Sequence, residues 1–499
     1  MSHASRLAVS LLALAPFIAA TPARADPVTM PAGANVTADA AGALQTQIRA
    51  WVAGLTGPAV DFGSHALRVT PEGDAYRFEV PVMGPVAGTG WAITGAPITA
   101  IAKPTDGGGW TIQSLHLPTP IRADQPAAPD GSPRNWMLTL AGQESHGRFD
   151  PTLRGISSFD TVLHGYVSVT QTATGTQTMH YDSYTAHVGW TPAGDGRVTM
   201  TNTGQGQNLT VFVDRPAGAQ PVTVSAGSIR STGRVERIAF DRIGAIVRDI
   251  GGLVPSAVQA AAAAAAPNSI SAADRPRLHD LVVSLRDLLG GVQAETTMEH
   301  LRFDLGGQSG SLASLTVGGR AAAAGGMLDA SLHLAMAGID SPLIPQGPLR
   351  DYVPRRIALT PHLSGIPATD LIALLLHAID TGDQDSLQAG AIALLAKGPL
   401  KAGLDDVLLD LGGTVLKANG VVTVAALDDI KGSARIDATG LDTLIHSANT
   451  VPELASARPF LIVLKGIGEQ KGDITTWNIT YADGQTLVNG TDLSTLMPK

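Results

Sequence analysis

The tightest cluster of polar residues suited to acid–base chemistry is His146, Arg148 and Asp150, in the segment ESHGRFDPTLRG. At alternating positions of a strand, these side chains lie on one face, where an imidazole and a carboxylate can act as general acid and base. No nucleophile is evident beside them. Asp150 precedes Pro151, a pair that more often starts a turn, here with Arg154 pairing locally. The sequence therefore favours a structural turn over a catalytic site.

A second group of possible ligands, His180, Asp182 and His187, contains side chains that bind metal ions. On a strand, His180 and Asp182 share a face, whereas His187 falls on the other face. The alternation predicts that the three do not converge on an ion.

The acidic residues Asp380, Asp383 and Asp385 resemble part of a calcium-binding loop. They lack the glycine and the terminal glutamate that such a loop requires, so a solvated turn before the next helix is the simpler interpretation. Likewise, Gly307–Ser311 (GQSGS) has the wrong spacing for the nucleophile turn of a serine hydrolase. We therefore expect no catalytic residue, no metal and no cofactor, and we expect that the protein is not an enzyme.

Composition narrows the classes of function further. The chain has no cysteine, which excludes disulfides, thiolate metal sites and a cysteine nucleophile. A formal net charge of -9 argues against nucleic acid as a partner and against electrostatic docking on anionic lipid. Aromatic residues make up only 4% of the chain, so stacking platforms for sugars or bases should be sparse.

Residues 1–25 have the pattern of a secretory signal peptide. Arg6 precedes an apolar run from Leu7 to Ala20, and the small residues that end at Ala25 predict cleavage before Asp26. The run of about 14 residues is shorter than the roughly 20 that a membrane-spanning helix needs. We expect export to a bacterial periplasm.

The next segment, 26–250, is predicted to be an N-terminal β-rich half. Asp39–Gly54 carries apolar residues at helical spacing and predicts a packing helix. From Val60 to Asp214 the period changes to two, with short strands between glycine and proline turns, and RVTPEGDAYRFEVPV predicts a hairpin. An alanine-rich helical connector at 251–290 follows.

Residues 291–499 are predicted to be a C-terminal β-rich half. Strands are expected at Thr297–Leu305, Ser311–Gly318 and Met327–Ala337, and a glycine-punctuated meander at Asp405–Ile445. A helix near Leu441–Ala457, a strand in FLIVLKGIG and a last pair of strands in WNITYADGQTLVNG complete it. The fold class is mainly β with α (α+β): large curved antiparallel sheets, a few packing helices and two strand-rich halves.

A helical hairpin is expected near 367–397, with arms at Thr369–Ile379 and Ser386–Lys397. Its first arm is too apolar for a surface helix, so it is either buried or faces an apolar ligand. The candidate contacts for such a ligand are Leu371, Ile372, Leu375 and Ile379.

Several segments together carry a family resemblance: the helix that ends in Ala50 and Trp51, RVTPEGDAYRFEVPV, GGGWTIQSLHLP, GRFDPTLRGISSF and ITYADGQTLVNGTDLSTL. With these, the chain is similar to a secreted bacterial family known as domain of unknown function 2125, for which no catalytic residues carry over. The C-terminal pattern of strands and helices also resembles the periplasmic parts of AsmA-like proteins, which implies long curved sheets associated with lipid movement. This chain lacks their usual membrane anchor and their greater length.

Taken together, these patterns lead to the hypothesis of a periplasmic, non-enzymatic protein that binds or moves an apolar, lipid-like ligand for the cell envelope. A protein-binding envelope scaffold is the alternative, and a periplasmic enzyme or a sugar-binding protein comes after it. The sequence does not define an oligomeric state.

Overall fold

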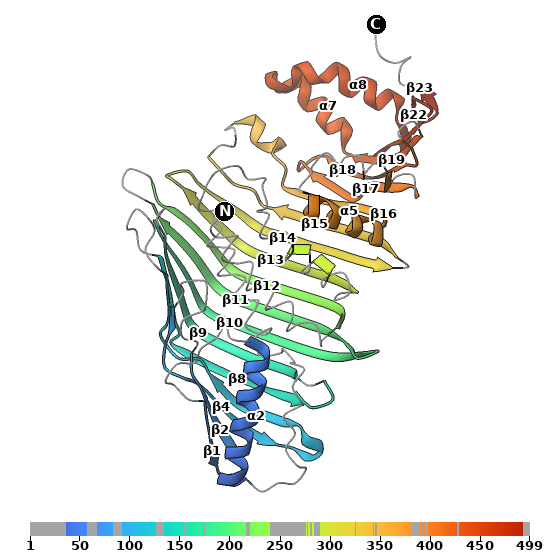
Figure 1. Cartoon of the computed structure of the whole chain (residues 1–499). Helices are drawn as coiled ribbons and strands as arrows, with labels where there is room; N and C mark the ends of the chain where they lie inside the picture. Colours follow the sequence, from blue (N-terminus) through green and yellow to red (C-terminus); the bar gives the residue numbers. More distant parts are fainter. Residues whose placement is uncertain are drawn as a thin grey trace. The chain divides into compact units, whose positions relative to one another are not determined.

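In the computed structural model the chain is mainly β, with large antiparallel sheets and a few helices, as the sequence predicts (Figure 1). It divides into two compact units, Met1–Gly290 and Gly291–Lys499. The structure describes residues 36–239 and 290–492 with internal gaps at 57–66, 83–91, 126–133, 154, 173–174, 216–219, 325, 343, 345–346, 382–389, 391–392, 395–397 and 427–428, and between the two ranges only 276, 278–279 and 282–283. The predicted signal peptide and most of the predicted connector lie outside the described residues.

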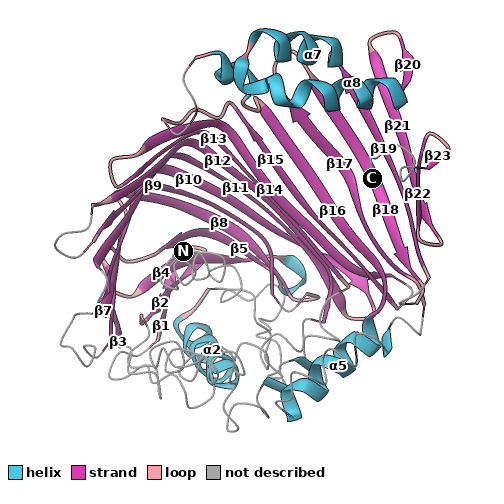
Figure 2. Cartoon of the chain, turned by 90° about the horizontal axis from the view of Figure 1, so that it is seen from above, coloured by secondary structure: helices cyan, strands magenta, loops and turns pink. Residues whose placement is uncertain are grey.

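The described part of the first unit contains helix α2, a short 3-10 helix and strands that pair in the antiparallel sense. Their bounds are α2 (Ala38–Thr56), β1 (Arg68–Glu72), β2 (Ala75–Val80), β3 (Ala92–Thr94), β4 (Ile98–Pro104), the short 3-10 helix η2 (Asp106–Gly108), β5 (Trp110–His116), β6 (Ile121–Gln125), β7 (Arg134–Thr139), β8 (Gly142–Asp150), β9 (Gly155–Thr172), β10 (Gly175–Gly194), β11 (Arg197–Asp214) and β12 (Val222–Ala239). The predicted first hairpin is confirmed, because β1 and β2 meet at the pair Glu72 and Ala75. Figure 2 shows that the long strands β9 to β12 bend along their length.

This first sheet divides into two branches beside β9. Strand β8 pairs with the first part of β9 and β7 with the last part, so both lie along one edge of it. Beyond them, β6 and β3 continue from β7, whereas β5, β4, β2 and β1 continue from β8. The division falls where Ala141 faces Gly165, whose φ of +54° and close approach leave no room for a side chain: an added Cβ would lie 2.7 Å from that of Ala141.

Helix α2 packs against the branch that ends in β1. Its buried Leu44 joins a core with residues from β1, β2, β4 and β5, namely Val69, Tyr76, Ala102 and Trp110. The side-chain oxygen of Gln45 also accepts a hydrogen bond from the backbone nitrogen of Val69 at 3.1 Å. The packing helix expected from helical spacing is thereby confirmed.

The second unit contains the remaining strands and most of the described helices. Their bounds are β13 (Gly291–Leu305), β14 (Ser309–Ala324), β15 (Met327–Ala337), the 3-10 helix η3 (Pro348–Tyr352), β16 (Arg356–Pro367), α5 (Ala368–Thr381), β17 (Leu400–Asp410), β18 (Val415–Val424), β19 (Ile430–Thr439), α7 (Leu441–Thr450), the 3-10 helix η4 (Pro452–Ala457), α8 (Arg458–Ile467), β20 (Glu469–Lys471), β21 (Ile474–Ala482), β22 (Gln485–Val488) and β23 (Thr491–Asp492). Strands β13 to β19 pair in chain order, and β21 pairs next to β19. The predicted meander at Asp405–Ile445 is confirmed as β17, β18 and β19 up to Thr439, whereas Leu441–Ile445 form the start of α7.

The helices of the second unit lie at opposite ends of its strands. Helix α5 directly follows β16 and α7 follows β19, and three antiparallel steps separate these two strands. Because each step reverses the strand direction, the two helices begin at opposite ends of the sheet, as Figure 2 shows.

One sequence prediction in this unit is wrong: FLIVLKGIG forms helix α8, not a strand. Pro459 stands in the first turn, where a helix tolerates proline. Leu461, Leu464 and Ile467 recur at intervals of three, so a helix places them together against the core. The predicted helix at Leu441–Ala457 forms as α7 and η4, with Pro452 at the start of the second piece.

The predicted helical hairpin is described in its first arm, which forms α5. Of the second arm, only Gly390, Ala393 and Leu394 are described, and they are helical. No helix in the described part of the chain is both long enough and apolar enough to cross a membrane.

Candidate functional site

The strand register of the second unit sorts its side chains into two faces, because directly paired residues of antiparallel strands point to the same side. One side, here called the apolar face, is made of three rows that run across the sheet from β13 to β21. The first row is Val292, Ala321, Ala330, Leu363, Ala402, Val422, Gly432 and Tyr481. The second is Ala294, Gly319 and Leu332, followed by Pro361, Leu404, Gly420, Ala434 and Ile479. The third is Thr296, Val317, Leu334, Leu359, Val407, Ala418, Ile436 and Trp477.

None of these row residues is charged, and six of the larger ones are exposed. Between 38% and 51% of the residue surface is exposed at Val292, Val317, Leu332, Leu404, Val422 and Tyr481. These residues come from six different strands, so exposure extends across the sheet. At about 4.8 Å between neighbouring strands, the face is roughly 33 Å wide. An accessible apolar surface on this scale is typical of a binding site.

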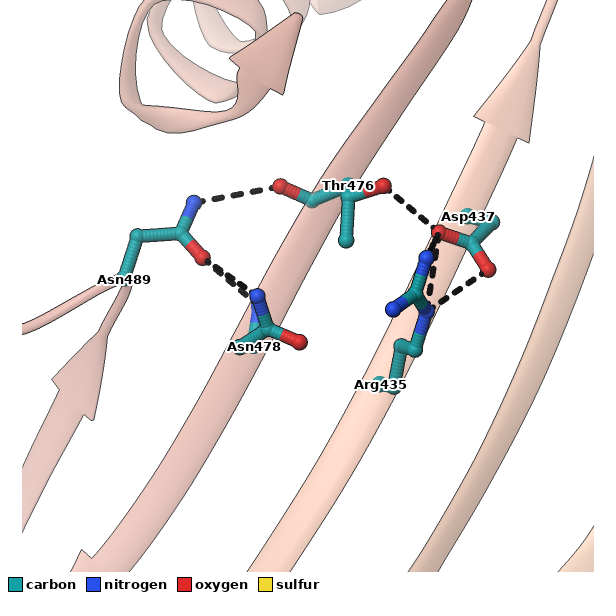
Figure 3. A network of polar contacts seen from close by, with 5 residues as sticks. All are labelled: Arg435, Asp437, Thr476, Asn478 and Asn489. Atoms are coloured by element: carbon teal, nitrogen blue, oxygen red, sulfur yellow. Dashed lines mark hydrogen bonds and ion pairs between the residues drawn. The ribbon is translucent and has the colours of Figure 1, made fainter. Parts of the chain in front are cut away.

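The charged residues of β18 and β19 lie on the opposite side. Arg435 pairs with Asn419 between the second and third rows, and Lys417 pairs with Asp437 just beyond the third row. Figure 3 shows part of this polar side: Arg435 donates to both carboxylate oxygens of Asp437, at 2.9 and 3.0 Å, and Thr476 donates its hydroxyl at 2.6 Å. The Arg435 guanidinium, and then the Thr476 hydroxyl, lower the pKa of the Asp437 carboxyl. The sheet is therefore amphipathic, with its ionic contacts on the polar side.

Helices α7 and α8 cover only one corner of the apolar face. Leu441 and Leu444 of α7, and Leu461 and Leu464 of α8, pack into a cluster with residues of β18, β19, β21 and β22, namely Leu416, Ile436, Ala438, Trp477, Ile479 and Val488. The exposed residues of the face lie mainly on the other strands or nearer the opposite strand ends. The helices thus bury the third row near β19 and β21 and leave the rest uncovered by them.

The apolar residues proposed as ligand contacts in α5 have unequal exposure. Ile379 is buried, Leu371 and Ile372 are intermediate, and 41% of the Leu375 surface is exposed. The helix is amphipathic, with both a packed side and an accessible apolar side chain. The sequence suggested that a curved, aliphatic sheet handles an apolar ligand, but the contacts it named all lie in α5, and it did not identify the strand residues of the apolar face.

The predicted acid–base cluster does not form as a unit. Asp150 accepts hydrogen bonds from the backbone nitrogen and hydroxyl of Thr152, at 2.8 and 2.7 Å, and these contacts lower its pKa. The turn interpretation of Asp150 is confirmed, while the pairing expected of Arg154 falls outside the described residues. The register shift between Arg148 and Phe149 places its extra residue, Ser157, in β9, and β8 itself stays in regular register with β5.

His146 and His187 instead lie on either side of Asp160, in the middle strand of three. The distance from His187 Nδ1 to Asp160 Oδ1 is 2.7 Å, and from His146 Nε2 to Asp160 Oδ2 it is 3.7 Å. All three side chains are strongly exposed. Sequence reasoning missed Asp160 because only the register of β8, β9 and β10 brings it between the histidines.

His187 also lies on a different face from the predicted one. The rings of Tyr181 and Tyr184 are 5.8 Å apart, although strict alternation would place residues three apart on opposite sides. The strand therefore switches faces between them, and this puts His180 and His187 on the same side, far apart along β10. The predicted neighbour relation of His180 with Asp182 is confirmed, at 3.7 Å.

Three tyrosines with contacting rings lie where β10 changes face: Tyr166, Tyr181 and Tyr184. Burial raises the pKa of Tyr166 to about 12 and raises those of Tyr181 and Tyr184. Gly204 and Gly206 in β11 make space for these rings, since an added Cβ would lie 2.7 Å from atoms of Tyr184 and Tyr181 respectively. The tyrosines are thus part of the packing of the first unit.

The remaining candidates that the structure describes, Ser309 and Asp380, lie in a hairpin and in a helix end. Ser309 starts β14 in a hairpin, and the backbone nitrogen of Gly307 donates to Asp304 at 2.8 Å. Asp380 lies in the last turn of α5, whereas Asp383 and Asp385 lie outside the described residues. Within the described part of the chain, no three His, Cys, Asp or Glu side chains are arranged to hold a metal ion.

Comparison with models of protein families, with curated proteins and with solved structures found no match to this chain. The candidate site is therefore defined by its own geometry, as an uncharged, accessible sheet face partly covered by helices at one corner.

Proposed function

We propose that this protein is an exported, periplasmic, non-enzymatic factor that binds the acyl chains of a lipid on the apolar face of its second unit. The observation that carries the proposal is the set of large, exposed apolar side chains on a face whose rows contain no charged residue. Apart from the hydroxyls of Thr296 in β13 and Tyr481 in β21, the rows offer contact area without polar side chains, so the preferred ligand is a hydrocarbon.

The energetics favour such a ligand. Burial of one methylene contributes roughly 0.8 kcal/mol, so a chain of about fifteen methylenes gains on the order of 12 kcal/mol before ordering costs. A reactive residue is not needed for this task. The mixture of small residues such as Ala330, Gly420 and Ala434 with larger ones such as Leu332 and Val422 also forms a relief into which a flexible chain can fit.

The helix α5 is the second element of the proposal. Its exposed Leu375, together with Leu371 and Ile372, would add apolar contacts from the strand end at which β16 leads into the helix. Ile379 is buried and would act by packing the helix in place. The resemblance to AsmA-like proteins agrees with a role in lipid movement and remains a prediction.

Mass spectrometry of organic extracts from the purified mature protein tests the proposal. We expect acyl-chain lipid in stoichiometric amount, and we expect added phospholipid to raise the melting temperature of stripped protein. Absence of lipid from the extract, together with an unchanged melting temperature, would instead favour a protein-binding envelope scaffold.

A further inference from the structure

We propose that helix α8 docks this protein on a lipid bilayer by inserting the side chains of Phe460, Ile462 and Val463. In these three residues 64%, 48% and 51% of the surface is exposed, which makes α8 the helix with the most accessible apolar side chains among those described. The inference rests on the proposed function, because it identifies the source from which an acyl chain reaches the apolar face.

Helix α8 carries apolar side chains of two kinds, some packed against the sheet and others exposed. Leu461, Leu464 and Ile467 pack into the core of the second unit. At 100° per residue, Phe460 falls within the arc of these packed residues at the start of the helix, Val463 falls beside that arc, and Ile462 lies further round. The two charged residues, Arg458 and Lys465, fall together on the remaining arc, two turns apart, and Lys465 forms an ion pair with Asp442 of α7. A helix with this arrangement lies in the boundary of a bilayer with its charges toward water.

The outward side of α8 is fixed by its hydrogen bonds to the sheet. The indole of Trp477 donates to the carbonyl oxygen of Leu464, and the side-chain amide of Asn489 donates to that of Ile467, each at 2.8 Å. These bonds hold the last turn against β21, so the helix cannot rotate its exposed residues into the core. Its apolar side is presented rigidly.

Area and continuity favour a bilayer over a second copy or another protein. The three exposed side chains offer on the order of 300 Å², whereas each partner of a stable protein interface contributes about 800 Å². Insertion into hydrocarbon needs no complementary surface. The same helix packs on Ile436 and Trp477, at the covered corner of the apolar face, so a docked helix places that face next to the lipid.

Docking through inserted side chains predicts binding that depends little on charge, in keeping with the net charge of -9. We expect the mature protein to sediment with phosphatidylcholine vesicles, and we expect that added phosphatidylglycerol or salt changes this binding little. Phe460→Ser combined with Val463→Ser should weaken vesicle binding by about tenfold or more. Because both positions are exposed, the variant should keep the melting temperature of the parent protein.

A labelling experiment locates the contact. The chain has no cysteine, so Val463→Cys carries a polarity-sensitive fluorophore at one position, and Asn449→Cys, at an exposed polar site on α7, is the matched control. Phosphatidylcholine vesicles should shift the emission to the blue for the label at 463 and leave that at 449 unchanged. Equal shifts, no shift, or a dimer in solution that the double serine variant dissociates would overturn the proposal.

Vesicle binding and fatty-acid binding are measured separately, so the experiments distinguish this inference from the proposed function. In the absence of vesicles, the double serine variant should bind a fluorescent fatty acid as the parent protein does. Loss of both activities in that variant would overturn a docking role distinct from the apolar face. Retained vesicle binding in a protein that binds no fatty acid would support docking and contradict the proposed function.

Discussion

The indole nitrogen of Trp477 donates a hydrogen bond of 2.8 Å to the carbonyl oxygen of Leu464. Trp477 belongs to the third row of the apolar face, and Leu464 lies near the end of α8. One side chain thus contributes to the apolar face and also satisfies a carbonyl that the helix end leaves without an intrahelical partner. The position of α8 on the sheet depends on it.

Trp477→Phe should reduce the free energy of unfolding by about 2 kcal/mol, because it removes the donor to Leu464 and leaves a small void. Hydrogen exchange should show faster exchange of the α8 amides in this variant. The control is Trp136→Phe, which removes a hydrogen bond to Ser168 in the first unit. If exchange in α8 is the same in both variants, the indole does not hold the helix.

The close contact between Gly206 and the Tyr181 ring allows packing in the first unit to be tested. Gly206→Ala should destabilise the protein by about 1–3 kcal/mol, since the new methyl group would lie 2.7 Å from the Tyr181 ring and from Ile229. Gly42→Ala is the matched control, because its Cβ meets nothing within 4 Å in α2, and it should be neutral or slightly stabilising. Urea unfolding measures both. Equal effects of the two substitutions would contradict the close packing at Gly206.

The buried tyrosines predict a loss of stability in alkali. The pKa of Tyr166 is about 12 in the folded chain and about 10 when unfolded, so its contribution is complete below pH 10. Between these values the unfolded chain releases the proton while the folded chain retains it, and stability falls as the pH rises. Tyr166→Phe should make the alkaline loss shallower in urea titrations. Complete ionisation of all tyrosines near pH 10 in the folded protein, followed by ultraviolet absorbance, would exclude this.

Much of the fold was predictable from local patterns. Alternating residues and glycine turns identified β17, β18 and β19, and helical spacing identified α2 and α5. Alternation failed where the strand changes face, as between Tyr181 and Tyr184, because this change depends on the positive φ of Gly165 and Asn208 in the neighbouring strands. Segment 460–468 was assigned to a strand because its β-branched residues favour strands, whereas packing of Leu461 and Leu464 decided for a helix.

The sequence predicted the apolar character of the candidate site, but not which residues form it. Aliphatic strands and the apolar helix α5 suggested a hydrocarbon ligand, but the contacts named from sequence were all in α5, whereas the larger apolar surface is on the strands. The sequence pattern around an apolar strand residue such as Val422 is the same whether or not another layer of the structure covers it. Its 43% exposure depends on which helices pack on the sheet, and this is a property of the tertiary structure.

Binding of an acyl chain on the apolar face is tested most directly by equilibrium binding of a fluorescent fatty acid to matched variants on the two faces of β18. Val422→Glu places a charge on the apolar face, and Asn419→Glu places the same charge on the polar side, where Asn419 pairs with Arg435. An acyl chain over Val422 would bury that carboxylate, so we predict affinity lower by about tenfold or more for Val422→Glu and within about twofold of the parent for Asn419→Glu. Equal affinities of the two variants would contradict binding of the lipid on the apolar face.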